Sequence, residues 1–122
     1  MEFSLDRGTA TYQIQAYEPG CITVSGEKIA HSILILAEHL ISPWEPGSLE
    51  LMKAEDIERI LTFKPEVVII GTGHKMQRPS LEVLRPLIDQ NIGFEIMDTK
   101  AACRTYTLLM SEDRKVAALL IL

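Results

Sequence analysis

The sequence has little of what would place a protein in a membrane or an oxidising compartment. It contains only two cysteines, Cys21 and Cys103, too far apart to form a CxxC or zinc-ligand pattern. We therefore expect two free thiols, no metal site and no cofactor. The apolar runs, Ile33–Ala37 among them, are far shorter than the roughly 20 residues that cross a bilayer. We expect no membrane span.

An excess of basic residues is also absent. The net charge of −5 argues against general electrostatic binding of nucleic acid or anionic lipid. Aromatic and basic residues do not interleave, so we expect no nucleic-acid partner. The N-terminal stretch Met1–Arg7 has two acids and no apolar signal core, which predicts a cytoplasmic location.

What is present fits one globular domain over residues 1–122. The hydrophobic fraction is 47% and the charged fraction 24%, as in ordinary folded proteins. A chain of this length forms a substantial core on its own. No repeat, low-complexity tract or linker divides it.

The first third reads as a β-meander. Thr11–Tyr17 and Cys21–Ser25 alternate apolar and polar residues, and Pro19-Gly20 predicts the turn between them. Ile29–Ala37 is expected to form a third strand. Ser42–Ser48 then reads as an irregular loop. Its Trp44 has two alternatives, an exposed patch with Ile41 for a partner or packing back onto the core, and we favour the second.

The second half alternates strands and helices. We expect helices over Ala54–Phe63, from Ser80 to Gln90 and over Lys100–Met110, the third capped by Asp98 or Thr99. The inner face of the second is predicted to carry Leu81, Leu84, Leu87 and Ile88. The strands are Val67–Ile70, Phe94–Met97 and a central Val116–Ile121. The first two should pair in parallel through a right-handed βαβ crossover. The fold class is α/β, with three layers, a mixed central sheet, βαβ units in the second half and the N-terminal meander.

The candidate site is a cleft at the carboxyl ends of two parallel strands, where open α/β sheets bind ligands. Two loops should meet there, Gly71-Thr72-Gly73-His74 and Asp98-Thr99. Free N–H groups at a helix start and glycines that allow close approach favour an anion. GTGH lacks both the dinucleotide fingerprint and the P-loop pattern, so the alternative is two glycines that only shape a turn.

Several side chains of this cleft have a chemical reading and a structural one. His74 and Asp98 could form a general-base pair, but a surface histidine beside a helix-capping aspartate is favoured. The helix dipole could activate Cys103, but a buried inert cysteine is commoner. Arg104 completes the candidate cleft, and a structural salt bridge is its favoured role. Tyr106 is expected to bury its ring with the hydroxyl at an edge.

Three stretches carry a family resemblance: Ile69–Gly73 (IIGTG), Gly93–Leu109 (GFEIMDTKAACRTYTLL) and Glu112–Ala118, with Pro79 between them. They resemble a widespread domain-of-unknown-function family that includes a mitochondrial complex I assembly factor and bacterial and archaeal proteins. The resemblance implies a three-layer fold and little chemistry. The family commonly has Asn where this chain has Thr107, so a role carried over to that position is in doubt.

Two functions from different classes follow. The first is a non-enzymatic assembly or interaction protein with a protein partner near Trp44 or the GTG loop, related by family analogy to respiratory complexes. The second is a small-molecule or anion-binding enzyme that uses the cleft at the GTG loop. We favour the first because no complete catalytic set is present. The exposed edge of the meander is compatible with a homodimer.

Overall fold

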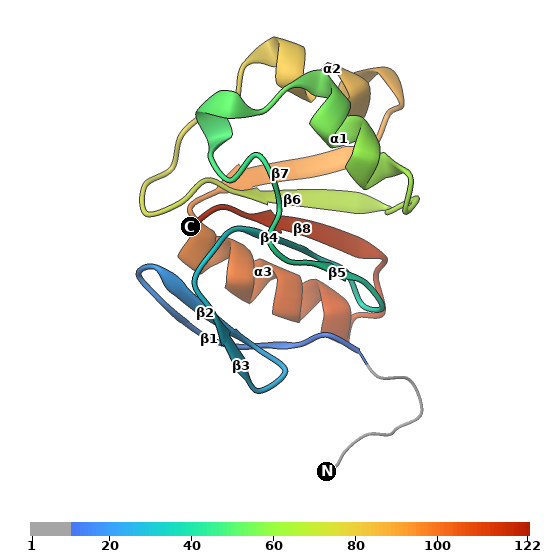
Figure 1. The fold of residues 1–122 in the computed structure, drawn as a ribbon. Coiled ribbons are helices and arrows are strands. Elements are labelled where there is room, and N and C mark those ends of the chain that lie inside the picture. The colour runs from blue at the N-terminus through green and yellow to red at the C-terminus, as the bar shows by residue number, and fades with distance from the viewer. Residues whose placement is uncertain (1–10) are drawn as a thin grey trace.

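The computed structural model describes residues 11–122. Figure 1 shows these residues as stacked layers: α1 and α2, then a five-stranded sheet, then α3, and finally a three-stranded sheet formed by β1, β2 and β3. The predicted α/β class with its N-terminal meander is confirmed. The small sheet adds a further layer beyond the helix that covers the main sheet.

The small sheet is an antiparallel meander in the order β1-β2-β3. Its strands are Ile14–Glu18, Cys21–Val24 and Glu27–Ile29. The register of β1 on β2 shifts between Ile14 and Ala16, a β-bulge. Because β2 lies in the middle of the strand order, β1 and β3 are the edge strands of this sheet, and β1 contacts α3.

The expected single strand over Ile29–Ala37 is wrong. The chain leaves the small sheet after Ile29 and enters the large sheet as β4, Ile33–Ile35. Ser32 marks the junction, because its hydroxyl donates to the Gly47 carbonyl at 2.8 Å and accepts from the Leu122 N–H at 3.1 Å. A buried polar bridge fixes the change of sheet where alternation alone suggested a continuous strand.

The large sheet has the order β5-β4-β8-β6-β7. Its remaining strands are β5 Leu40–Ile41, β6 Val67–Gly71, β7 Gly93–Met97 and β8 Val116–Leu120. The strand β6 pairs in parallel with both β7 and β8, whereas β4 pairs with β8 antiparallel. The predictions of a mixed sheet, of parallel β6–β7 pairing and of a central final strand are confirmed.

Helices cover both faces of the large sheet. The short helix η1, Leu49–Leu51, precedes α1, Ala54–Leu61; α2 spans Leu81–Asp89 and α3 spans Thr99–Ser111. Alternate residues of the strands point into two separate apolar clusters, one under α1 and α2 and one under α3. Because β6 and β8 are buried at every position, both strands lack alternation in the sequence.

The predicted inner face of α2 is partly wrong. Leu84 and Leu87 are buried together with Val83, but Leu81 is 61% exposed and Ile88 47% exposed. At about 100° per residue, the last two lie on one stripe to the side of the buried face. The first and last turns of a short helix therefore leave apolar residues at the surface.

The loop after β5 folds back onto the core, as favoured. Trp44 is only 1% exposed, so the alternative of an exposed tryptophan patch is wrong. The Arg59 guanidinium lies 4.1 Å from the centre of the Trp44 ring and donates a hydrogen bond to the Glu45 carbonyl at 2.8 Å. These contacts attach the loop to α1.

Candidate functional site

The two loops predicted to form the cleft lie side by side. The Thr72 N–H donates to the Met97 carbonyl at 2.8 Å, and the Thr99 N–H donates to the Gly73 carbonyl at 2.9 Å. The end of β6 and the start of α3 are therefore joined through their backbones. This juxtaposition follows from the parallel pairing of β6 and β7.

Thr99 and Gly71 belong to the packing between α3 and the sheet. The Thr99 hydroxyl is fully buried, donates to the Ile121 carbonyl at 2.5 Å and accepts from the Gly73 N–H at 2.8 Å. A Cβ atom at Gly71 would lie 3.0 Å from both the Ala102 Cβ and the Thr99 Oγ1. The glycine thus allows the helix to approach the strand closely, and the hydroxyl links three chain segments.

Thr72 and Asp98 hold the loop and the helix start. The Thr72 hydroxyl donates to the Lys75 carbonyl at 2.8 Å and accepts from the Gln77 N–H at 3.0 Å. The Asp98 carboxylate accepts from the Ala101 N–H at 2.8 Å, which makes Asp98 the N-cap of α3. These side chains use their hydrogen-bonding capacity within the fold.

Gly73 and His74 form the outer part of the loop. Gly73 has a φ of +105°, a conformation that favours glycine, and the space around its Cβ position is open. His74 is exposed. Within residues 11–122 no hydrogen bond joins His74 to Asp98, and no group of three or more His, Cys, Asp or Glu side chains is arranged to hold a metal ion. The general-base pair stays a prediction.

Cys103 and Arg104 lie one turn further along α3, where the two side chains diverge. Cys103 is buried, and burial raises the pKa of its thiol to about 12, so the thiol stays protonated near neutral pH. This agrees with the inert structural reading and opposes an activated nucleophile. Arg104 is exposed and lines a groove that sequence reasoning did not identify.

That groove runs between α3 and the edge of the small sheet, and we call it the α3–β1 groove. It has a volume of about 540 Å³. One side is formed by residues 14–17 of β1. The other side is formed by residues spaced along α3: Lys100, Cys103, Arg104, Thr107, Leu108 and Ser111. The groove brings together segments more than 80 positions apart in the sequence.

Both apolar and basic groups face the α3–β1 groove. Leu108 is 57% exposed, and Ile14 and Tyr17, which line the other side of the groove, are half-buried. The pKa of Tyr17 is raised, chiefly because its ring is partly buried and then through the influence of Cys103 and Asp98. Tyr17 therefore lies towards the N-terminal half of α3. The lining residues include two cations, Lys100 and Arg104, and no acid.

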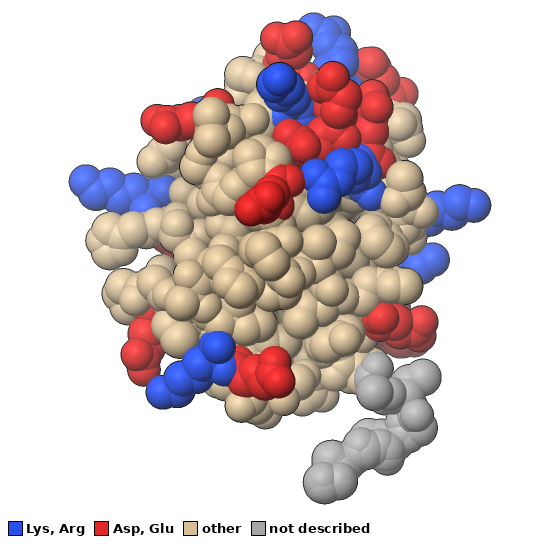
Figure 2. Space-filling view, in the orientation of Figure 1, with Lys and Arg blue, Asp and Glu red and all other residues tan. Residues whose placement is uncertain are grey.

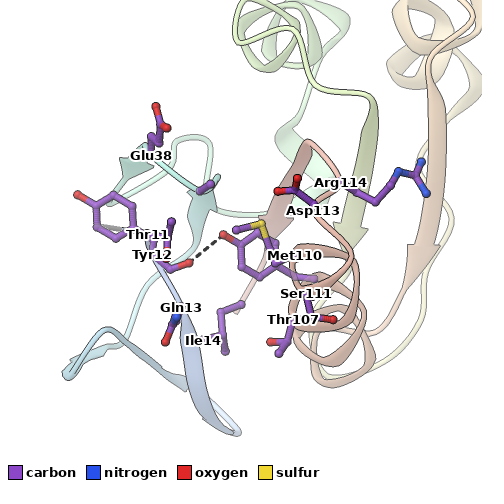
Figure 3. Close-up of a pocket in the computed structure, with 12 residues that line it drawn as sticks. Thr11, Tyr12, Gln13, Ile14, Glu38, Thr107, Met110, Ser111, Asp113 and Arg114 are labelled. Carbon is purple, nitrogen blue, oxygen red and sulfur yellow. Dashed lines mark hydrogen bonds between the residues drawn. The ribbon is translucent and has the colours of Figure 1, made fainter. Parts of the chain in front are cut away.

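A second cavity, of about 510 Å³, adjoins the groove near the C-terminal end of α3 (Figure 3). Here the Tyr106 hydroxyl donates to the Tyr12 carbonyl at 3.0 Å, which confirms the expected buried ring with a polar edge. Arg114 points away from the cavity in Figure 3, in keeping with its ion pair to Glu66 at 3.4 Å. The hydrogen bond of Tyr106 joins α3 to the chain before β1.

Thr107 lines both the α3–β1 groove and the second cavity. Its hydroxyl donates to the Cys103 carbonyl at 3.0 Å, one turn earlier in the same helix. Where the family resemblance would place an asparagine amide, this chain has a hydroxyl that bonds its own helix. A role carried over from that amide is therefore not supported at Thr107.

The charges on one face of the molecule are unevenly distributed. Figure 2 shows acidic and basic side chains gathered at the upper right, over α1, while the middle of this face is largely uncharged. No helix within residues 11–122 is long and apolar enough to cross a membrane. A cytoplasmic location stays a prediction.

The fold and the groove together define a class of protein: an α/β domain whose mixed sheet carries a small antiparallel sheet across a single helix. Sequence comparison then gives the particular family. Residues 14–121 match the family described as "Protein of unknown function (DUF498/DUF598)", and the chain belongs to it. The resemblance carried by the IIGTG and MDTKAACRTY segments is thereby confirmed.

Relatives of two kinds are similar over much of the chain. The NADH dehydrogenase [ubiquinone] 1 alpha subcomplex assembly factor 3 of Danio rerio is 31% identical over 99% of this chain and 68% of its own length. The human protein of that name is 27% identical over 88% of this chain and 59% of its own length. The 13 kDa major membrane protein of Francisella tularensis is 33% identical over 75% of each chain.

Solved structures show the same fold. The crystal structure of a Bordetella parapertussis protein is similar with a TM-score of 0.87 and 33% identity, covering 94% of this chain and 98% of that one. The crystal structure of an outer membrane protein from Bartonella henselae gives a TM-score of 0.79 and 31% identity, covering 93% and 96%. The whole chain from the first strand to the last therefore matches known architectures.

Proposed function

We propose that this protein is a non-enzymatic assembly or interaction protein that binds a protein partner through the α3–β1 groove. The observation that carries the proposal is Leu108, an exposed leucine on α3 that lines the same groove as the half-buried Ile14 and Tyr17 of β1. Contiguous apolar side chains at the surface with a charged rim are typical of protein contact sites.

The polar groups of the predicted cleft support this choice over an enzyme. Thr72, Asp98 and Thr99 each bond backbone groups of the loop or helix that they build. In the α3–β1 groove, by contrast, Lys100 and Arg104 are exposed side chains next to apolar surface. The enzyme alternative at the GTG loop stays a prediction.

The relatives suggest what kind of partner to seek. Several are named as assembly factors of NADH dehydrogenase, and that role belongs to proteins longer than this chain, which spans 68% of the Danio rerio one. For this chain we propose a subunit of a respiratory complex as the partner. We propose the groove beside α3 as the partner surface in place of the two expected regions, the GTG loop and the region near Trp44, which is buried.

The test compares two leucines of similar exposure. Leu108 lies in the groove, and Leu81, 61% exposed, lies on α2 on the opposite face of the large sheet. Wild-type protein, Leu108→Asp and Leu81→Asp are tagged, expressed in the native cells and purified gently, and co-purifying subunits are quantified by mass spectrometry. We expect a respiratory-complex subunit with wild type and Leu81→Asp, reduced at least about tenfold with Leu108→Asp, because hot-spot truncation typically costs 1.4 kcal/mol or more.

Equal recovery from all three proteins would place the contact elsewhere. Recovery of no respiratory subunit from any of them would contradict the respiratory assignment. Matching thermal melts of the two variants exclude unfolding as the cause of any loss.

A further inference from the structure

The α3–β1 groove follows the edge of a sheet rather than its face. Four consecutive residues of β1, 14 to 17, line it. A groove over a sheet face would be lined by alternate residues, because successive side chains of a strand point to opposite sides. The β-bulge between Ile14 and Ala16 interrupts this alternation, but the neighbours Ala16 and Tyr17 lie beyond it and both line the groove. The groove therefore runs along the backbone edge of the strand.

The hydrogen bonds before β1 show which way its backbone groups face. Gln13 faces β2, since its carbonyl accepts from the Ser25 N–H at 2.9 Å and its N–H donates to the Ser25 hydroxyl at 3.2 Å. Tyr12 faces outwards, donating to the Ala37 carbonyl at 2.8 Å and accepting from the Tyr106 hydroxyl. By this alternation Ile14 again faces outwards, into the groove.

Beyond Tyr12 the outer edge is open. Within residues 11–122, the backbone groups of Ile14–Glu18 have no hydrogen-bond partner outside their own sheet. An open edge of this kind is a template for another strand. Ala37 and Tyr106 occupy the neighbouring edge position at Tyr12, so the open part begins at Ile14.

The wall facing this edge is a straight row on α3. Lys100, Arg104 and Leu108 are spaced four residues apart and lie on one stripe of the helix. The row is about 12 Å long and residues 14–17 span about 10 Å, so an extended segment of four to six residues fits beside both. The two cations lie towards Tyr17 and the leucine lies towards Ile14.

The charges select the occupant. The chain carries a net charge of −5, yet the residues lining the groove include two cations and no acid. A second copy paired antiparallel on this edge would set the Tyr17 end of one copy against the Ile14 end of the other, so the cations would face apolar side chains rather than acids. An acidic segment of a different protein is complementary.

We propose that the α3–β1 groove binds an extended segment of a protein partner as a fourth strand on β1, with acidic side chains at Lys100 and Arg104 and an apolar side chain at Leu108. This inference rests on the proposed function and specifies its binding mode. Backbone hydrogen bonds to the edge supply affinity, and the α3 row supplies specificity.

The experiment selects random peptides of about ten residues on the full chain by display, then measures the binding of a synthesised winner by calorimetry. We expect winners that combine acidic and apolar residues. Methylating the backbone nitrogens of the bound peptide one at a time should weaken binding about tenfold at alternate positions only, because one strand edge pairs with every second N–H. Leu108→Asp should weaken binding, Leu81→Asp should not, and Lys100→Glu with Arg104→Glu should reverse the preference for acidic peptides.

Three outcomes would overturn the proposal. In the first, the selection enriches no peptide. In the second, backbone methylation does not weaken the binding of the selected peptide, or that peptide binds as a helix. In the third, the protein alone forms a concentration-dependent dimer that Leu108→Asp converts to monomer. If the peptide experiment fails but Leu108→Asp still loses the cellular partner, strand addition is rejected and the proposed function is kept. If peptides bind as expected but no respiratory subunit is recovered from cells, the groove is kept as a binding site and the respiratory role is rejected.

Discussion

Two regions of the surface along α3 differ in what their polar groups bind. At the N-terminal end, the GTG loop and Asp98-Thr99 bond one another and the last strand. Along the middle of the helix, the edge of β1 and the exposed row from Lys100 to Leu108 are open to solvent. The sequence of the first region resembles that of a ligand site, but its polar groups bond one another and hold the fold together. The second region has the geometry of a binding surface.

The largest effect on stability should come from the buried hydroxyl of Thr99, which links α3 to the GTG loop and to Ile121. Replacing Thr99 by Val keeps the shape but leaves the Gly73 N–H and the Ile121 carbonyl without their partner. Each unsatisfied buried group costs about 1–3 kcal/mol, so we expect a loss of roughly 3 kcal/mol in the free energy of unfolding, measured in urea. Thr107→Val is the matched control. Its hydroxyl bonds only its own helix, so a change within about 0.5 kcal/mol is expected. Equal effects at both positions would break the distinction.

Gly71 and Gly73 sharpen the comparison within the loop itself. Gly71→Ala should cost about 2–3 kcal/mol, because the added Cβ meets backbone and side-chain atoms of α3 at 3.0–3.1 Å. Gly73→Ala meets open space and suffers only from its positive φ, a cost of about 1–2 kcal/mol. Chemical unfolding of both variants is the measurement. A larger loss for Gly73→Ala would contradict the close packing of α3 on β6.

The pH dependence of stability tests whether the Cys103 thiol is buried and unreactive. Burial raises the pKa of its thiol from 9.0 to about 12, so the folded state keeps a proton that the unfolded state loses. Stability should therefore be complete below about pH 9 and fall above it, by at most about 1.4 kcal/mol per pH unit for this group. Cys103→Ala should flatten that fall between about pH 9 and 10, before the raised pKa of Tyr106 contributes. An unchanged slope would show that the thiol titrates normally.

The smallest effect on stability should come from the groove. Leu108→Asp and Leu81→Asp replace exposed leucines in helices, so each should shift the free energy of unfolding by about 0.5 kcal/mol. Thermal unfolding of the two variants checks this. A loss of several kcal/mol for Leu108→Asp alone would mean that this leucine serves the core rather than a partner.

Much of the fold could be predicted because its signals are local. An unbroken β-branched run indicated the buried β6, a continuous apolar run indicated β8, and the alternation of strands and helices indicated parallel pairing. The break at Ser32 could not be predicted, because the groups that hold it, Gly47 and Leu122, are distant in the sequence. The exposed Leu81 was missed since periodicity alone does not show where the neighbouring helix ends.

The candidate site could also be predicted only in part. The meeting of the GTG loop with Asp98-Thr99 followed from the rule that the carboxyl ends of parallel strands lie together. The hydrogen bonds of the Thr99 hydroxyl could not be predicted, because its acceptor, the Ile121 carbonyl, belongs to a distant part of the chain. The α3–β1 groove was invisible because it joins two segments more than 80 positions apart. Of the eight residues proposed for the cleft, Cys103 and Arg104 line this groove, and only their place on α3 hinted at it.

The most direct test of the central claim is photo-crosslinking from single positions in living cells. A photoreactive amino acid replaces Leu108 in the groove, His74 on the GTG loop or Leu81 on α2, and crosslinked proteins are identified by mass spectrometry. We predict a specific crosslinked protein from position 108 and none from 74 or 81. A crosslink to a protein from position 74, with none from 108, would contradict the claim and return the binding surface to the loop.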